Sequence, residues 1–128
     1  MQKSIDLPAY LKNFDPQALT ASVIDAGEEW ADEDAAASAL EETRKTVLAE
    51  ITLEVQAAAL VEKGAKLPIS QAETKAMADP RYREHIEQMV THRKLANRAR
   101  VRYDMGKMRL ELMRSVQATL RNEMFLNR

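Results

Sequence analysis

The chain has 128 residues, which is enough for one domain with a modest core. It contains no cysteine, which excludes a disulfide framework and a thiolate metal site and suits an intracellular protein. Because no apolar run resembles a signal peptide or a membrane span, we expect a cytoplasmic protein without membrane contact. Only 5% of the residues are aromatic and three are glycine, and β-branched residues rarely alternate with polar ones, so we predict an all-α fold.

Charge is distributed unevenly along the chain. Residues 1–63 contain thirteen acidic and five basic residues, a net charge of −8, whereas residues 64–128 contain seven acidic and fourteen basic residues, a net charge of +7. Such blocks are typical of halves that pack on each other, or of an acidic surface for proteins beside a basic surface for a polyanion. The two interpretations are compatible.

The first part of the chain predicts an arm followed by a short helix. Residues 1–15 are expected to form an irregular arm, although the helical spacing of their apolar residues also fits a short helix that docks on the core or on a partner. Asp15 and Pro16 are typical of a helix start, and the helix that follows them is expected to be interrupted near Gly27.

An acidic cluster, Glu28 to Asp34, surrounds Trp30, the only tryptophan. Acidic runs are typical of solvated helix faces, but a tryptophan among acids also fits a partner-binding position. We therefore divide the chain into an N-terminal arm with an acidic helical segment, residues 1–34, and a helical hairpin for oligomerisation and DNA binding, residues 35–128.

The hairpin is predicted from two long amphipathic segments and a short one. Ala35 to Lys63 forms the first helix, which Gly64 ends. Ser70 and Glu73 fit a capping box at the start of a short corner helix that ends near Asp79. The apolar stripe of the first helix comprises Leu40, Val47, Ile51, Val55, Ala58 and Val61.

The last segment, Pro80 to Arg128, is rich in helix-forming residues and predicts one long helix, either continuous or bent at Gly106. A seam with a spacing of about 3.5 residues is expected to be its packing face. The seam comprises Ala96, Ala99, Tyr103, Gly106, Leu110, Met113, Gln117, Leu120 and Met124.

A second apolar stripe gives this helix more apolar surface than one partner helix needs. A helix of this length would extend about 70 Å, whereas a compact globule of this chain length is roughly 36 Å across. We therefore expect a homo-oligomer. The second stripe comprises Val101, Met105, Met108, Leu112 and Val116.

A basic residue also recurs at every seventh position of the last helix, which aligns these side chains in one row. The row comprises Arg93, Arg100, Lys107, Arg114, Arg121 and Arg128. Relative to the packing seam it occupies position e of the heptad, and Arg102 and Arg109 occupy position g. These positions carry salt bridges in coiled coils, so structural pairing and nucleic-acid contact both fit the pattern.

The stretch Arg93 to Arg114 holds eight bases and two acids, and Tyr103 is its only aromatic residue. A cationic track with few rings favours contact with the nucleic-acid backbone, without sequence preference. The predicted nucleic-acid-binding residues are Lys63, Lys66, Arg93, Lys94, Arg98, Arg100, Arg102, Lys107, Arg109 and Arg114.

Enzyme motifs are lacking, and we predict neither a catalytic residue, a metal nor a cofactor. His85 and His92 lie seven residues apart, about 10 Å along a helix, which is too far for one metal ion. The three glycines are too scattered to form a phosphate-binding loop. We expect the histidines to face solvent or an interface.

The layout from Leu48 to Met124 resembles the phage recombination mediator proteins of the UvsY type. The resemblance rests on an Ala- and Glu-rich helix, a Gly-Lys turn, the stretch LPISQAETKAMAD from Leu67 to Asp79, and a long final helix. It covers about sixty percent of the chain. It implies a small helical protein that assembles into a ring, binds single-stranded DNA and helps load a RecA-like recombinase onto strands covered by single-strand-binding protein.

One departure changes the expected site. In that family the helix that enters the turn carries basic DNA-binding residues, whereas this chain has Gln56 to Ala59 there, with bases only at Lys63 and Lys66. Binding would therefore depend on those two lysines and on the row that begins at Arg93.

Two other functions also fit the sequence. A protein-interaction module, such as a phage inhibitor of a host defence complex, would use the acidic cluster around Trp30. A structural assembly component would use the basic row to pair with acidic residues of a neighbouring helix.

Overall fold

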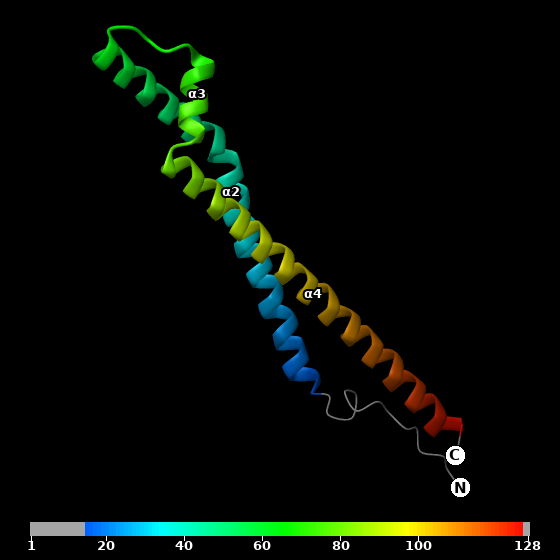
Figure 1. The fold of residues 1–128 in the computed structure, drawn as a ribbon. Coiled ribbons are helices and arrows are strands. Elements are labelled where there is room, and N and C mark those ends of the chain that lie inside the picture. Colours follow the sequence, from blue (N-terminus) through cyan, green and yellow to red (C-terminus); the bar gives the residue numbers. More distant parts are fainter. Residues whose placement is uncertain (1–14, 127–128) are drawn as a thin grey trace. The chain divides into compact units, whose positions relative to one another are not determined.

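A computed structural model describes residues 15–126, which form three helices in chain order (Figure 1). They are α2 (Pro16–Lys63), α3 (Ile69–Met77) and α4 (Pro80–Leu126). No strand occurs among these residues, which confirms the all-α prediction. The arm predicted for residues 1–15 lies, apart from Asp15, outside the described part of the chain.

Both ends of α2 lie where local chemistry predicted them. The Asp15 carboxylate accepts hydrogen bonds from the backbone N–H groups of Gln17 at 3.0 Å and Ala18 at 3.3 Å, so it caps the first turn. Gly64 follows the last turn with a φ of 72°, a left-handed conformation that glycine adopts without strain.

The predicted interruption near Gly27 is wrong, because α2 runs continuously through this residue. A Cβ atom at Gly27 would lie 3.2 Å from Cε2 of Tyr103, so the tyrosine ring packs directly over the backbone here. Glycine has a low helix propensity, which predicted a break at this position. Packing against the Tyr103 ring explains why a glycine is found within a continuous helix here. The division of the chain at residues 34 and 35 stays a prediction.

The predicted capping box of α3 is also wrong. Pro68, with φ −55° and ψ 144°, is the N-cap, and no side chain caps the helix. Ser70 already lies inside α3, where its carbonyl accepts a 2.9 Å hydrogen bond from the Thr74 hydroxyl. A proline that fixes φ therefore starts the helix two residues earlier than the serine would.

α4 begins after Asp79 and continues through Gly106, so the helix is not interrupted there. The Asp79 carboxylate accepts a 2.8 Å hydrogen bond from the backbone N–H of Arg81. A Cβ atom at Gly106 would lie 2.5 Å from Cγ2 of Val23, so this glycine permits close helix packing.

The described residues divide into two compact units. The first contains Asp15, residues 16–30 of α2 and residues 97–126 of α4. Its buried core comprises Val23, Ala26, Ala99 and Met113. The members of the predicted seam are buried or half-buried as far as Met113, and Leu120 is also half-buried. Gln117 is exposed, with Val116 half-buried beside it, and Met124 is 67% exposed.

The second unit contains residues 31–96. Figure 1 shows α3 beside the C-terminal part of α2, where Ile51, Ala76 and Tyr82 form the core cluster. In the last turns of α2, Ala59 is buried, whereas Ala58 and Val61, which were predicted in the stripe, are exposed.

Candidate nucleic-acid interface

Arg93, the first member of the predicted basic row, is committed to ion pairs within the second unit. Its guanidinium donates hydrogen bonds to Asp34 at 2.6 Å and to Glu41 at 2.9 Å and 3.1 Å. The hydrogen bonds to Glu41 and Asp34 raise the pKa of Arg93 above its ordinary value. Its charge is therefore already balanced by two carboxylates of α2.

Arg102 has the same role in the first unit. It donates a 2.5 Å hydrogen bond to Glu29, and both side chains are about half exposed. Arg93 and Arg102 thus form the helix-pairing contacts that coiled coils place beside their seams.

Arg100 and Lys107 lie over the two aromatic rings of the first unit. The Arg100 guanidinium is 5.8 Å from the centre of the Trp30 ring, and Nζ of Lys107 is 4.6 Å from that of Tyr103. Both distances permit cation–π attraction. The rings, 5.7 Å apart and inclined by 41°, pack on each other and under these cations, so they do not form an open platform for stacking bases.

The other predicted binding residues are exposed, and none of them has an ion-pair partner within residues 15–126. Lys63, Lys66 and Lys94 belong to the second unit. Those of the first unit are Arg98, Arg109 and Arg114.

Within the first unit, four exposed side chains recur every seventh residue of α4: Arg100, Lys107, Arg114 and Arg121. We call these four residues the basic row. The segment from residue 97 to 126 that carries it contains seven bases and only three acids. Multiple phosphate contacts are the chemistry that such a row permits.

Trp30 is half-buried against Tyr103 rather than displayed on the surface. The neighbouring acid Glu29 holds Arg102, and in the second unit Glu33 and Asp34 hold His92 and Arg93. The acidic cluster is thus largely occupied by contacts within the chain. The sequence missed these pairings because they join residues more than fifty positions apart.

Both histidines join α4 to α2 in the second unit. His85 donates from Nε2 to the Leu40 carbonyl at 2.7 Å, and His92 donates from Nδ1 to the Glu33 carboxylate at 2.5 Å. They occupy a helix interface, one of the two positions expected from the sequence. Within residues 15–126, no group of three His, Cys, Asp or Glu side chains is placed to hold a metal ion.

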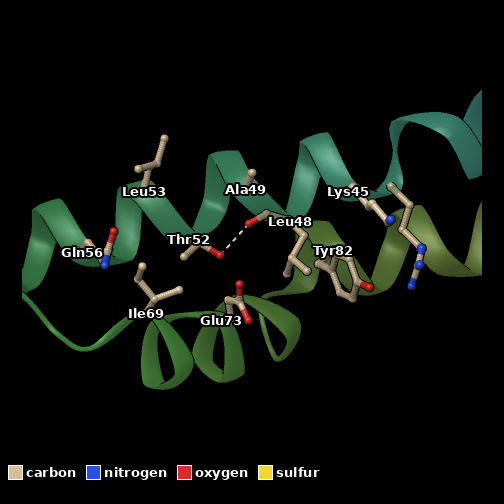
Figure 2. A pocket seen from close by; sticks show the side chains of 10 residues that line it. Lys45, Leu48, Ala49, Thr52, Leu53, Gln56, Ile69, Glu73 and Tyr82 are labelled. Carbon is tan, nitrogen blue, oxygen red and sulfur yellow. Dashed lines mark hydrogen bonds between the residues drawn. The ribbon is translucent and has the colours of Figure 1, made fainter.

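A pocket of about 550 Å³ lies in the second unit, between α2, α3 and the first turn of α4. Figure 2 shows the side chains that line it. Its wall is largely apolar, and the Thr52 hydroxyl donates a 2.7 Å hydrogen bond to the Leu48 carbonyl. No sequence motif signalled it, since it depends on how α3 is placed. Its lining comprises Arg44, Lys45, Leu48, Ala49, Thr52, Leu53, Gln56, Ile69, Glu73 and Tyr82.

Comparison with known proteins does not assign the chain to a family. No family model matches the sequence, and no curated protein or solved structure matches it significantly. Across residues 15–126, no helix combines the length and apolar character needed to cross a membrane.

Proposed function

We propose that this helical protein is not an enzyme and binds single-stranded DNA in the cytoplasm through phosphate contacts of the basic row. The observation that carries the proposal is the exposed, regularly spaced row on a segment with seven bases and three acids. Arg93 and Arg102 are left out of the interface, because carboxylates of α2 already balance their charges.

The arrangement of the rings indicates the mode of binding. Trp30 and Tyr103 are packed together under Arg100 and Lys107, so base stacking contributes little. Binding is therefore dominated by the phosphate backbone, has little sequence preference and is sensitive to salt. Several copies on one strand would strengthen a weak contact made by each chain.

The biological role within this proposal is that of a recombination mediator or accessory in phage DNA recombination and repair. It rests on the resemblance of Leu48 to Met124 to the UvsY type of mediator. The partners would be a RecA-like recombinase, which the protein helps to load, and the single-strand-binding protein that covers the DNA.

Fluorescence anisotropy of a labelled single-stranded oligonucleotide, measured at several salt concentrations, tests the binding. The logarithm of affinity should fall against the logarithm of salt concentration with a slope near −3 or steeper, since each released counterion contributes about 0.7. Absence of binding at low salt would refute the proposal.

A pair of matched variants tests the assignment of residues. Arg114→Gln with Arg121→Gln removes two exposed charges of the basic row, and should weaken binding about tenfold and make the slope shallower by about 1.4. Arg93→Gln with Arg102→Gln also removes two charges, but both are already paired with acids. This control should leave the slope unchanged; an equal loss in both variants would show that total charge, not the row, determines binding.

A structural assembly component is the second candidate function, because the ion pairs of Arg93 and Arg102 show that bases of α4 do hold helices together. It predicts self-association without DNA binding at low salt, and dissociation of the assembly itself at high salt. Light scattering beside the anisotropy titration separates the two functions.

A further inference from the structure

One side of α4 in the first unit carries apolar side chains that no part of the described chain covers. Val101 is 55% exposed, Met105 52%, Met108 67% and Leu112 44%. The packing against α2 is made instead by Tyr103 and Gly106, which contact the region of Gly27 and Val23. We call Val101, Met105, Met108 and Leu112 the outer stripe.

The outer stripe has the spacing of a coiled-coil seam. Its members are separated by four, three and four residues, the alternation of positions d and a in a heptad. Val101 and Met108 occupy d, and Met105 and Leu112 occupy a. The basic row falls outside this seam, at position c, so both surfaces can be occupied at once.

Charges of opposite sign border the two edges of the outer stripe. Arg102 and Arg109 occupy position e, and Asp104 and Glu111 occupy position g. Arg109 has no ion-pair partner within residues 15–126, and Asp104 has only a 3.9 Å contact with Arg100. Arg102, in contrast, already holds Glu29.

This charge pattern distinguishes between the two ways in which another helix can cover the stripe. In a parallel pair of identical helices, position g of one helix lies beside position e of the next heptad in the other. Asp104 then meets Arg109 of the second copy, and the symmetry makes this contact twice. In an antiparallel pair, g meets g and e meets e, so acids would face acids and bases would face bases.

We propose that the outer stripe is the interface of a parallel, two-fold symmetric pair of this chain, fixed by reciprocal ion pairs between Asp104 and Arg109. The partner is a second copy of the chain, because each stripe carries both the acid, Asp104, and the base, Arg109, that the other stripe needs for its ion pairs. Two heptads give a small interface, so the pairing is reversible. This inference is independent of the DNA-binding function.

Charge reversal tests the proposal by sedimentation over a range of protein concentrations. Asp104→Arg and Arg109→Asp should each weaken pairing about tenfold, because each places like charges together twice. The double variant restores opposite charges and should pair nearly as well as the natural chain. An equimolar mixture of the two single variants should also pair better than either variant alone.

Cross-linking tests the parallel orientation directly, since the chain has no cysteine of its own. In a parallel pair, Val101→Cys lies beside its own copy and should form an intermolecular disulfide on mild oxidation. Gln117→Cys is the matched control: Gln117 is exposed but lies at position f, away from the stripe. It should cross-link much less.

Three results would overturn the proposal: a chain that stays monomeric at every concentration, pairing that charge reversal at Asp104 and Arg109 does not change, or association in which Val101→Cys and Gln117→Cys cross-link equally. Helix content from circular dichroism should be unchanged in all variants, because the substituted residues are exposed. DNA binding is tested with different variants, Arg114→Gln and Arg121→Gln. The pairing proposal and the DNA-binding proposal can therefore fail independently.

Discussion

Gly106 and Val23 show how closely the backbones of α2 and α4 approach in the first unit. By helix propensity alone, Gly106→Ala should stabilise α4 by about 1 kcal/mol. The added methyl group would, however, lie 2.5 Å from Cγ2 of Val23, so the Val23 side chain or one of the two helices would have to shift. We therefore expect Gly106→Ala to lower the free energy of unfolding by about 1–2 kcal/mol, measured by urea denaturation.

Val23→Ala provides the matched second substitution. Alone it removes buried methyl groups and destabilises the chain. Combined with Gly106→Ala it makes room for the new methyl group, so the double variant should lose less stability than the sum of the single variants. Additive losses, or a stabilising Gly106→Ala, would show that the helices can move apart without penalty.

At the scale of single elements, Asp79 fixes the start of α4. A side-chain hydrogen bond from Arg81, and then the bond from its backbone N–H, hold the pKa of Asp79 below its ordinary value of 3.8. Because the folded pKa is lowered, this stabilisation is complete above the unfolded pKa and is lost as the pH falls through the folded pKa.

Asp79→Asn isolates this effect, since asparagine also caps helices but does not titrate near this pH. The natural chain should be more stable than the variant at pH 7, and the difference should shrink as the pH falls below about 3.8. Urea denaturation followed by circular dichroism at a series of pH values measures it. A difference that is constant with pH would contradict the assigned role of the charge.

The helix ends show how far sequence chemistry reaches. Asp15, Gly64 and Asp79 act locally, and each ends or starts a helix where predicted. The wrong predictions involve long-range packing or competition between signals: the Tyr103 ring keeps α2 continuous at Gly27, and Pro68 starts α3 before Ser70. The first outcome depends on a contact distant in sequence, and the second on which of two neighbouring local signals prevails.

The candidate site was predictable to a similar extent. The seventh-residue spacing predicted that Arg114 and Arg121 lie in one row along the helix, and the structure shows that both side chains are exposed. The spacing alone left open whether each base faces solvent or an acid of another helix. Arg93 and Arg102 pair with carboxylates that are 52 to 73 residues away in the sequence. Only the structure therefore distinguishes these two paired bases from Arg114 and Arg121, which have no ion-pair partner within residues 15–126.

At the scale of the whole molecule, the core contains mainly small side chains. No large side chain is completely buried among the described residues, whereas Ala37, Ala72, Ala76 and Ala99 are fully buried. Such a core buries little apolar surface for its length, so covering the outer stripe should add a substantial part of the stability.

Thermal unfolding should therefore depend on protein concentration. At about a hundred times the dissociation constant, pairing contributes about 2.7 kcal/mol, which should raise the unfolding midpoint by several degrees. Circular dichroism measures the midpoint. Asp104→Arg, which weakens pairing about tenfold, should remove about 1.4 kcal/mol of this contribution and so lower the midpoint at the same protein concentration. A midpoint of the natural chain that does not change with concentration would contradict pairing in the folded state.

The position of Trp30 has a further practical consequence. The only indole of the chain lies under the guanidinium of Arg100, which is itself a member of the basic row. A phosphate that attracts Arg100 would withdraw a positive charge from the ring and change its emission. The proposed contact thus has an optical reporter within the chain: we expect the tryptophan emission of the unmodified protein to change when an unlabelled strand is added.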